Sequence, residues 1–160
     1  MSPKPLSIDF TIALEKATHY CAYQERCHQE VERKLKDWNV DPELHDAILS
    51  DLSQQIFLNE ERYSSRYVKG KVNIKKWGRY KIKLELKSRQ VSDYSINKAL
   101  KEIDEEKYIL NLQELLEKKS KSVKGTSAFE IRTKIFQYIL SKGYEAELIN
   151  EQLENYGITR

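Results

Sequence analysis

A block of basic residues near the middle of the chain is the feature best suited to binding chemistry. Positions 66 to 89 hold ten lysines and arginines and a single acid, Glu85, so the block has a formal charge of +9. The rest of the 160-residue chain holds 18 basic and 24 acidic residues, a charge of −6. Such an excess neutralises phosphates and releases their counterions. We therefore expect affinity for a polyanion that falls steeply with salt.

The candidate contact residues of this block are its ten cations together with one tryptophan. They are Arg66, Lys69, Lys71, Lys75, Lys76, Trp77, Arg79, Lys81, Lys83, Lys87 and Arg89. Tyr67 and Tyr80 lie in the same stretch, and aromatic rings among cations can stack on the exposed bases of single-stranded nucleic acid. An alternative is that the rings are core residues and the charges solvate one helix face. Charge alone does not decide between DNA and an acidic protein surface.

A second group, His19, Cys21, Cys27 and His28, contains the atoms that bind zinc. Their spacing fits a metal site poorly, because helical residues two apart face different ways and no Cys-x-x-Cys pair is present. Cys21 also falls within an apolar stripe, so we interpret it as a buried structural thiol. The sequence therefore predicts no metal site and no cofactor.

The residues that enzymes use as nucleophiles or bases show no catalytic arrangement. His45 stands among acids on what reads as a solvated helix surface, without a paired nucleophile. The acid pairs Glu60-Glu61 and Glu105-Glu106 open helices, where the helix dipole explains them. No glycine-rich phosphate loop of the Walker type is present. We predict that the protein is not an enzyme.

The composition favours an all-α protein that stays in the cytoplasm. Hydrophobic residues make up 39% and charged residues 33%, with only 5 glycines and 3 prolines, a balance rich in helix formers. No apolar run approaches the roughly 18 residues that suggest a membrane span, and no secretory signal pattern is visible. Two cysteines are too few for a disulfide framework. We expect reduced thiols and no membrane association.

Capping signals and apolar periodicity mark the expected helices. Asp41-Pro42, Asn59, Asp104 and the capping box Ser127-x-x-Glu130 each begin a helix, and Gly143 ends one. Two polar segments are predicted to lack regular structure: a basic loop over residues 69–78 and a flexible connection over residues 118–126.

An internal repeat organises these helices. Leu35 and Val40, Leu86 and Val91, and Ile139 and Tyr144 are matching pairs, which gives repeat lengths of 51 and 53 residues. This period predicts three stacked three-helix modules in an elongated, curved molecule. The predicted limits are 9–57, 58–103 (with the basic block, 66–89) and 104–158, after a flexible leader at residues 1–8. A single irregular helical bundle is the alternative.

From about residue 10 to about residue 156 the chain resembles the RecX family. The segments that carry the resemblance are Cys27-His28-Gln29-Glu30-Val31-Glu32-Arg33-Lys34-Leu35, Leu58-Asn59-Glu60-Glu61-Arg62-Tyr63, Tyr67-Val68-Lys69-Gly70-Lys71, Lys76-Trp77-Gly78-Arg79 and Leu140-Ser141-Lys142-Gly143-Tyr144. The central segments, where an acidic helix start runs into a basic Lys-Gly element, are the most specific. The chain departs from the family in Lys36-Asp37-Trp38-Asn39, which lacks glycine and leaves the geometry of that turn open.

The resemblance implies three tandem three-helix repeats and a function in regulating the recombinase RecA. RecX proteins dock in the groove of the RecA–DNA filament and inhibit or disassemble it. This implies a role in DNA repair that restrains homologous recombination, the SOS response and the co-protease activity of RecA. The expected partners are the RecA filament and single-stranded or duplex DNA, and a monomer is the expected state. Two alternatives stay open: a stand-alone helix-turn-helix DNA-binding protein, and an adaptor for another acidic protein.

Overall fold

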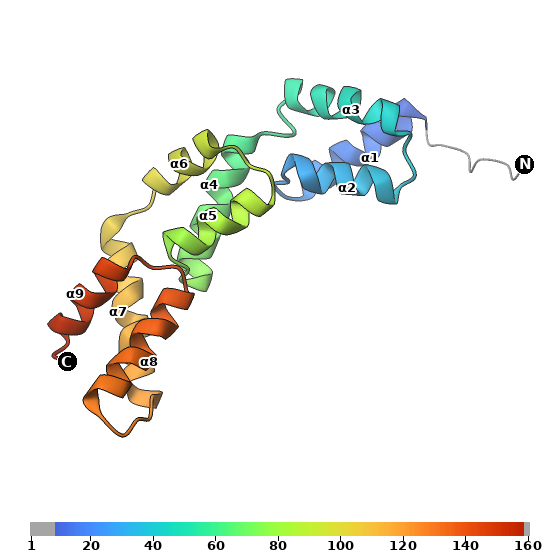
Figure 1. The fold of residues 1–160 in the computed structure, drawn as a ribbon. Coiled ribbons are helices and arrows are strands. Elements are labelled where there is room, and N and C mark those ends of the chain that lie inside the picture. The colour runs from blue at the N-terminus through green and yellow to red at the C-terminus, as the bar shows by residue number, and fades with distance from the viewer. Residues whose placement is uncertain (1–8, 159–160) are drawn as a thin grey trace, which may run out of the picture.

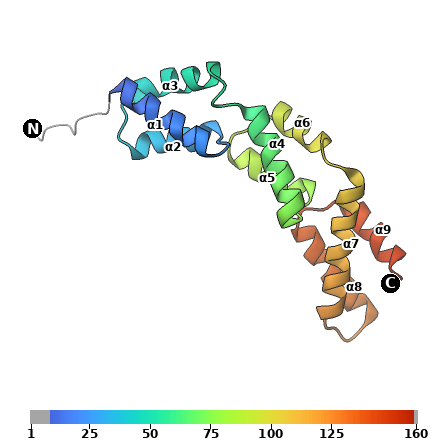
Figure 2. The same cartoon turned by 180° about the vertical axis from the view of Figure 1, so that it is seen from behind.

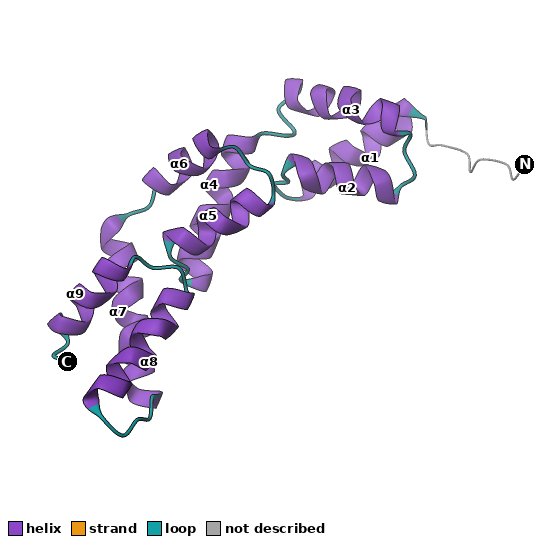
Figure 3. Ribbon diagram, viewed as in Figure 1, coloured by secondary structure: helices purple, strands orange, loops and turns teal. Residues whose placement is uncertain are grey.

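The computed structural model describes residues 9–158, and every regular element in that range is helical (Figures 1 and 3). The elements are α1 (Phe10–Tyr23), α2 (His28–Asp37), α3 (Pro42–Gln54), α4 (Glu60–Gly70), a π-helical turn, η1 (Lys71–Lys75), α5 (Arg79–Ser88), α6 (Asp93–Lys101), α7 (Glu105–Ser122), α8 (Ala128–Ser141) and α9 (Ala146–Asn155). The all-α prediction is confirmed. The expected leader, residues 1–8, lies outside the described residues. Within residues 9–158, no helix is both long enough and apolar enough to span a bilayer.

The helices form three successive modules, α1–α3, α4–α6 and α7–α9, in a curved row (Figure 1). The second helix of each module (α2, α5, α8) lies along the inner side of the bend, and the third helix (α3, α6, α9) lies along the outer side. Both views show this arrangement (Figures 1 and 2). The elongated, curved array agrees with the sequence prediction. We retain 9–57, 58–103 and 104–158 as the proposed module limits.

Each module surrounds its own apolar core, and the second helices use the same two positions for it. Val31 and Leu35 on α2, Ile82 and Leu86 on α5, and Ile135 and Ile139 on α8 are all fully buried. Burying one such side chain stabilises a fold by about 1.5–3 kcal/mol. A module of about 50 residues has only a small core of its own, and neighbours share residues. Cys27 packs into the second core, and Ile103 contacts both the second and the third core.

Helix ends follow the predicted signals. The side chains of Asp41, Asn59, Asp104 and Ser127 each accept a hydrogen bond from a backbone N–H in the first turn of their helix.

The turn after the second helix places one residue in the left-handed region in every module. Asn39 has φ 60°, Gln90 has φ 61° and Gly143 has φ 99°. Asparagine tolerates this conformation better than most residues. The first module therefore makes the same turn without a glycine, which answers the question that its sequence left open.

Both predicted irregular segments are more helical than expected. The basic segment 69–78 is not a loop: α4 runs to Gly70, the π-helical turn continues to Lys75, and α5 begins at Arg79. Buried Val72 extends the apolar stripe of Val68 by one turn, which explains the continuation. Similarly, α7 extends to Ser122, so the connection over residues 118–126 shrinks to residues 123–127. In both cases a polar composition was mistaken for a loop, although lysine is a good helix former.

Candidate nucleic-acid interface

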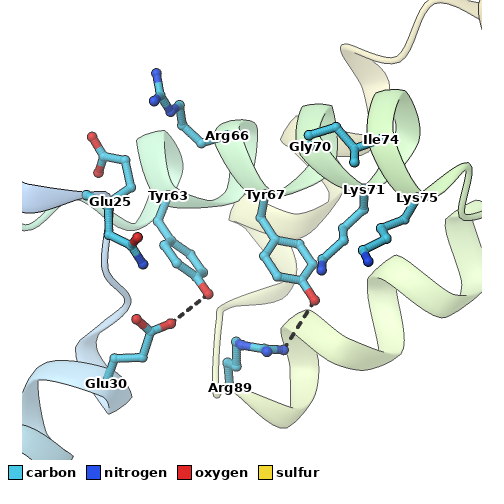
Figure 4. A pocket seen from close by; sticks show the side chains of 11 residues that line it. Glu25, Glu30, Tyr63, Arg66, Tyr67, Gly70, Lys71, Ile74, Lys75 and Arg89 are labelled. Atoms are coloured by element: carbon cyan, nitrogen blue, oxygen red, sulfur yellow. Dashed lines mark hydrogen bonds between the residues drawn. The ribbon is translucent and has the colours of Figure 1, made fainter.

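The basic block is positioned by α4, the π-helical turn and α5. A π turn inserts an extra residue into a helix. Here it is followed by the capping residue Lys76, whose φ of 55° reverses the chain. The N–H of Trp77 donates to the carbonyl of Lys71 at 3.0 Å and closes the reversal. Gly78 then caps α5, which returns beside α4 (Figure 4). This local fold brings the two basic segments of the block together.

Three cations and two rings alternate across this junction, and we call Arg89, Tyr67, Lys71, Trp77 and Lys81 the cation–aromatic ladder. The Arg89 guanidinium lies 5.0 Å from the centre of the Tyr67 ring, and the Lys71 ammonium lies 5.3 Å from it. The ammonium groups of Lys71 and Lys81 lie 4.6 and 4.5 Å from the Trp77 ring. Cation–π contacts contribute about 0.5–1 kcal/mol each at exposed sites. The rings therefore hold these cations in order without neutralising them.

The ladder also shows what its two rings do. With cations over them, Tyr67 and Trp77 support charges instead of presenting open faces to bases. Tyr80, at the start of α5, is the exposed ring of the block.

Ion pairing divides the ten cations into two groups. Four are paired with the chain's own acids: Lys76 with Glu114, Arg79 with Glu105 and Glu145, Lys87 with Asp93, and Arg89 with Glu85. The other six make no ion pair within 4.0 Å of an acid among residues 9–158; they are Arg66, Lys69, Lys71, Lys75, Lys81 and Lys83. The charge available to a partner is therefore smaller than the sequence count of +9.

A hollow of about 400 Å³ opens beside the ladder, between α4, the end of α5 and the segment that joins α1 to α2. Figure 4 shows Tyr63 and Tyr67 projecting from α4 toward Glu30 and Arg89, respectively. The Tyr63 hydroxyl donates to Glu30 at 2.9 Å, and Arg89 donates to the Tyr67 hydroxyl at 3.3 Å. Burial raises the pKa of Tyr63, and the nearby Glu30 carboxylate adds to this rise. The phenol therefore stays neutral and acts as a donor.

The hollow has an acidic and a basic end. Glu25 and Glu30 line the end nearest the first module, whereas Lys71, Lys75 and Arg89 line the other end. Glu25 is paired with Arg62 and Glu30 with Arg26, so the charge that the hollow offers to a polyanion is that of Lys71 and Lys75 at the basic end.

The predicted contact residues do not form a single strip. Lys71, Lys75, Lys81 and Arg89 gather around the hollow and the ladder. Lys69 instead lies in a second hollow of about 450 Å³ between α4 and α6, and Arg66 lines both. The block thus surrounds α4, and only part of it faces any one partner.

Arg79 belongs to a joint that fixes α5 against the third module. Its guanidinium lies 4.0 Å from the centre of the Tyr108 ring and donates to Glu145 at 2.7 Å. Burial opposes the charge of Arg79, yet the hydrogen bond to Glu145 and the neighbouring acids hold its pKa above the usual value. We therefore assign Arg79 a positioning role for α5.

Backbone contacts complete this joint. The N–H groups of Gly78 and Tyr80 donate to the carbonyls of Lys142 and Gly143 at 2.8 and 3.0 Å. A Cβ atom on Gly78 would lie 2.3 Å from the Gly143 carbonyl carbon, so this approach requires glycine at position 78.

Sequence reasoning missed several residues of the site. Tyr63 and Glu30 were not among the predicted contact residues, although Tyr63, Tyr67 and Lys71 follow one another at i, i+4 spacing, which places them on one face of a helix. The acids that pair with Lys76 and Arg79 gave no signal, because they lie far away in the sequence.

The other candidate groups have structural roles. His45 is not on a solvated surface, as expected from its acidic neighbours; it is buried, and its Nε2 lies 3.1 Å from the Val40 carbonyl. Helix α3 packs against α1 and α2, and His45 is buried on the same face of α3 as Ile48 and Leu52. Burial raises the pKa of the Cys21 thiol to about 11, so it stays protonated. Among residues 9–158, no three side chains of metal-ligating type come together.

Comparison with known proteins places the chain in a family. Three family models match in chain order: the first three-helix domain of RecX at residues 13–52, the second at 59–100 and the third at 106–153. The chain belongs to the RecX family. These matches exclude the single irregular bundle, and they place the cation–aromatic ladder in the second RecX domain.

Individual RecX proteins agree with this assignment. The chain is 32% identical over 139 residues to the regulatory protein RecX of Bacillus cereus (strain B4264), covering 87% of this chain and 52% of the relative. It is 31% identical over 139 residues to RecX of Bacillus mycoides (strain KBAB4), again covering 87% of this chain and 52% of the relative. The chain thus spans about half the length of the curated relatives it matches. These relatives are named regulatory proteins, which agrees with the prediction of a non-enzyme.

Solved RecX structures share the fold. The crystal structure of RecX from Lactobacillus salivarius aligns with a TM-score of 0.83 at 24% identity, covering 94% of this chain and 97% of that one. A second crystal structure, of a regulatory protein RecX, aligns with a TM-score of 0.84 at 21% identity, covering 91% and 73%.

Proposed function

We propose that this protein binds the RecA–DNA filament and inhibits it, and that the second module contacts the DNA. The cation–aromatic ladder is the observation that carries this proposal. Its lysines, Lys71 and Lys81, lie over aromatic rings and make no ion pair with an acid among residues 9–158. Membership of the RecX family supports RecA as the regulated protein.

The ladder suits a phosphate backbone for two reasons. Lysine normally loses considerable side-chain entropy when it is fixed, but Lys71 and Lys81 are already restrained by Trp77. Because both ammonium groups lie within 5 Å of the same ring centre, they are less than 10 Å apart. Phosphates recur about every 3.4 Å of axis along one strand, so two lysines at this separation can reach neighbouring phosphates of the same strand.

The curvature of the molecule supplies the rest of the mechanism. The inner side, formed by α2, α5 and α8, is long enough to follow a rod-like partner (Figure 2). A chain laid along a filament bridges neighbouring subunits, and it either blocks filament extension or competes with subunit contacts to DNA. The fixed joint at Gly78 and Arg79 keeps the second and third modules aligned for this contact.

Charge reversal of the two ladder lysines and of Lys75, which lines the hollow beside them, tests this function directly; we call this the ladder variant. The triple variant Lys71→Glu, Lys75→Glu, Lys81→Glu should weaken DNA-dependent binding by about 100-fold or more, because three phosphate contacts become repulsive. The matched control reverses one exposed lysine in each module: Lys36→Glu, Lys101→Glu and Lys124→Glu, with the same change of net charge. Inhibition of RecA strand exchange and ATP hydrolysis is the readout. Equal loss in both variants would show that only net charge matters, and full inhibition by the ladder variant would exclude the ladder.

A further inference from the structure

The solvent-exposed face of α5 carries two large apolar side chains. Tyr80 is 64% exposed and Leu84 is 69% exposed, although both belong to a ten-residue helix that packs into the core of the second module. They are four residues apart and therefore share one face, opposite buried Ile82 and Leu86. Helix α5 lies on the inner side of the bend (Figure 1), and this pair is on its solvent-exposed face.

The other two modules show that the architecture does not require this pair. Alignment of the buried positions Ile82 and Leu86 with their equivalents sets the register of the three second helices. Tyr80 and Leu84 then correspond to Gln29 and Arg33 on α2. On α8 they correspond to Thr133 and Gln137. Both other helices thus place polar residues where α5 alone exposes a tyrosine and a leucine, which indicates a binding function for these two side chains.

Lysines flank the apolar pair on both sides. Lys83 and Lys87 follow Tyr80 and Leu84 by three residues each, and Lys81 lies at the opposite edge of the face. Lys87 makes a loose, exposed contact of 3.6 Å with Asp93, and Lys81 and Lys83 have no acidic partner among residues 9–158. An apolar centre with positive edges is complementary to an apolar centre with negative edges.

We propose that the solvent-exposed face of α5 (Tyr80, Lys81, Lys83, Leu84 and Lys87) docks an acidic amphipathic helix of a protein partner. Leu84 would bury apolar area against the partner's apolar residues while the lysines meet its carboxylates. DNA fits less well, because a leucine gains little from a phosphate backbone. The inference rests on the proposed function and deepens it: the ladder contacts the DNA of a nucleoprotein filament, the exposed face of α5 contacts its protein, and Lys81, which belongs to both, lies where the two surfaces meet.

Photo-crosslinking shows whether protein or DNA contacts the exposed face of α5. We would replace Leu84 with p-benzoylphenylalanine and irradiate the protein on RecA filaments formed on a labelled oligonucleotide. Matched probes at the equivalent positions, Arg33 and Gln137, control for general proximity. The expected result is a protein adduct from position 84 that is much stronger than from positions 33 and 137. A DNA adduct from position 84, or equal protein adducts from all three positions, would overturn the proposal.

An exchange of residues between modules measures the affinity. The variant Tyr80→Thr, Leu84→Gln carries the residues of α8, and it should bind the filament about 10- to 100-fold more weakly, as for loss of an interface anchor. Its affinity for bare oligo-dT should stay within about twofold, whereas the ladder variant should lose both affinities. An unchanged filament affinity, or an equal loss on bare oligo-dT, would contradict the docking role. An unchanged thermal unfolding midpoint would confirm that the variant folds.

A synthetic peptide separates this inference from the proposed function. A helical peptide with leucines at i and i+4 and glutamates beside them should bind the wild-type protein, and Tyr80→Thr, Leu84→Gln should abolish this binding. A peptide with lysines in place of the glutamates should not bind. If wild-type protein bound no RecA filament, the proposed function would fail, and the peptide result would still decide on α5. No binding of the acidic peptide would overturn the docking face.

Discussion

The second module meets its two neighbours through joints of different construction. Toward the third module the contacts include backbone: Gly78 and Tyr80 donate to the carbonyls of Lys142 and Gly143, and the side-chain amide of Asn111 donates to the Val72 carbonyl. Toward the first module, side chains connect α4 and α5 to the region around the α1–α2 connection: Arg62 pairs with Glu25, Tyr63 donates to Glu30, and Gln29 donates to the Ser88 carbonyl.

This difference indicates which of the two joints is the more rigid. A backbone approach that only glycine permits has one geometry, whereas ion pairs between long side chains tolerate adjustment and are weakened by salt. Arg79, a further member of this joint, is half-buried against Tyr108 and Glu145 and also pairs with the exposed Glu105. We infer that the second and third modules act as one unit and that the first joint is the weaker one. The following predictions test this comparison.

The largest effect is expected at Gly78. In Gly78→Ala the new Cβ would lie 2.3 Å from the backbone of Gly143, so the second and third modules must separate. We expect a loss of about 3 kcal/mol or more in the free energy of unfolding, measured by urea denaturation. Gly70→Ala is the matched control, because nothing lies within 4 Å of its Cβ position on α4. It should stabilise the protein by about 0.5–1 kcal/mol. Similar values for the two variants would refute the glycine requirement.

The arginines of the two joints should differ in the same direction. Arg79→Met leaves the Glu145 carboxylate without its cationic partner and removes the guanidinium from the Tyr108 ring, and we expect it to cost about 2 kcal/mol. Arg62→Met removes an ion pair with Glu25 at a more exposed site and should cost about 1 kcal/mol. Urea denaturation at low and high salt checks both values. A larger cost for Arg62→Met would reverse the proposed ranking of the joints.

The repetitive part of this fold could be predicted from the sequence because local rules decide it. Each module buries the same two positions on its second helix. A further buried residue, Val40, Val91 or Tyr144, follows five positions after the second of them, so spacing alone revealed the repeat. Capping side chains such as Asp41 and Ser127 act on backbone groups two or three residues away, within the reach of sequence reasoning.

The site was predictable only in part, because distant contacts divide its charges. Glu114 and Glu145 lie 38 and 66 residues from the cations they pair with, so no local pattern announces that Lys76 and Arg79 are neutralised. The π-helical turn also escaped prediction, because Lys71 and Lys75 lie in a polar, lysine-rich stretch and only the folded structure brings Lys71 over Tyr67 and Trp77. The total charge of the block can be counted in the sequence, whereas the tertiary contacts determine which of its charges stay unpaired.

Alkaline unfolding compares the tyrosines at the centres of the two joints. Burial raises the pKa of both Tyr108 and Tyr63, and the carboxylates of Glu145 and Glu30 add to it. A folded pKa above the unfolded value of 10 means stability that is full below pH 10 and is lost as the pH rises toward the folded pKa. Tyr108→Phe and Tyr63→Phe should each flatten this loss, measured as unfolding free energy between pH 9 and 11 (about one pH unit either side of tyrosine's usual pKa). A slope that neither variant changes would refute the assignment.

The smallest effect is expected at the weakest contact of the first joint. Gln29 donates to the Ser88 carbonyl at 3.5 Å at an exposed site, so Gln29→Ala should change the unfolding free energy by less than about 0.5 kcal/mol. Asn111→Ala is its counterpart at the other joint. There a fully buried amide donates to the Val72 carbonyl at 2.9 Å, and its loss should cost about 1–3 kcal/mol because it leaves a buried acceptor unsatisfied. Equal costs for the two amides would mean that both joints hold the second module with the same strength.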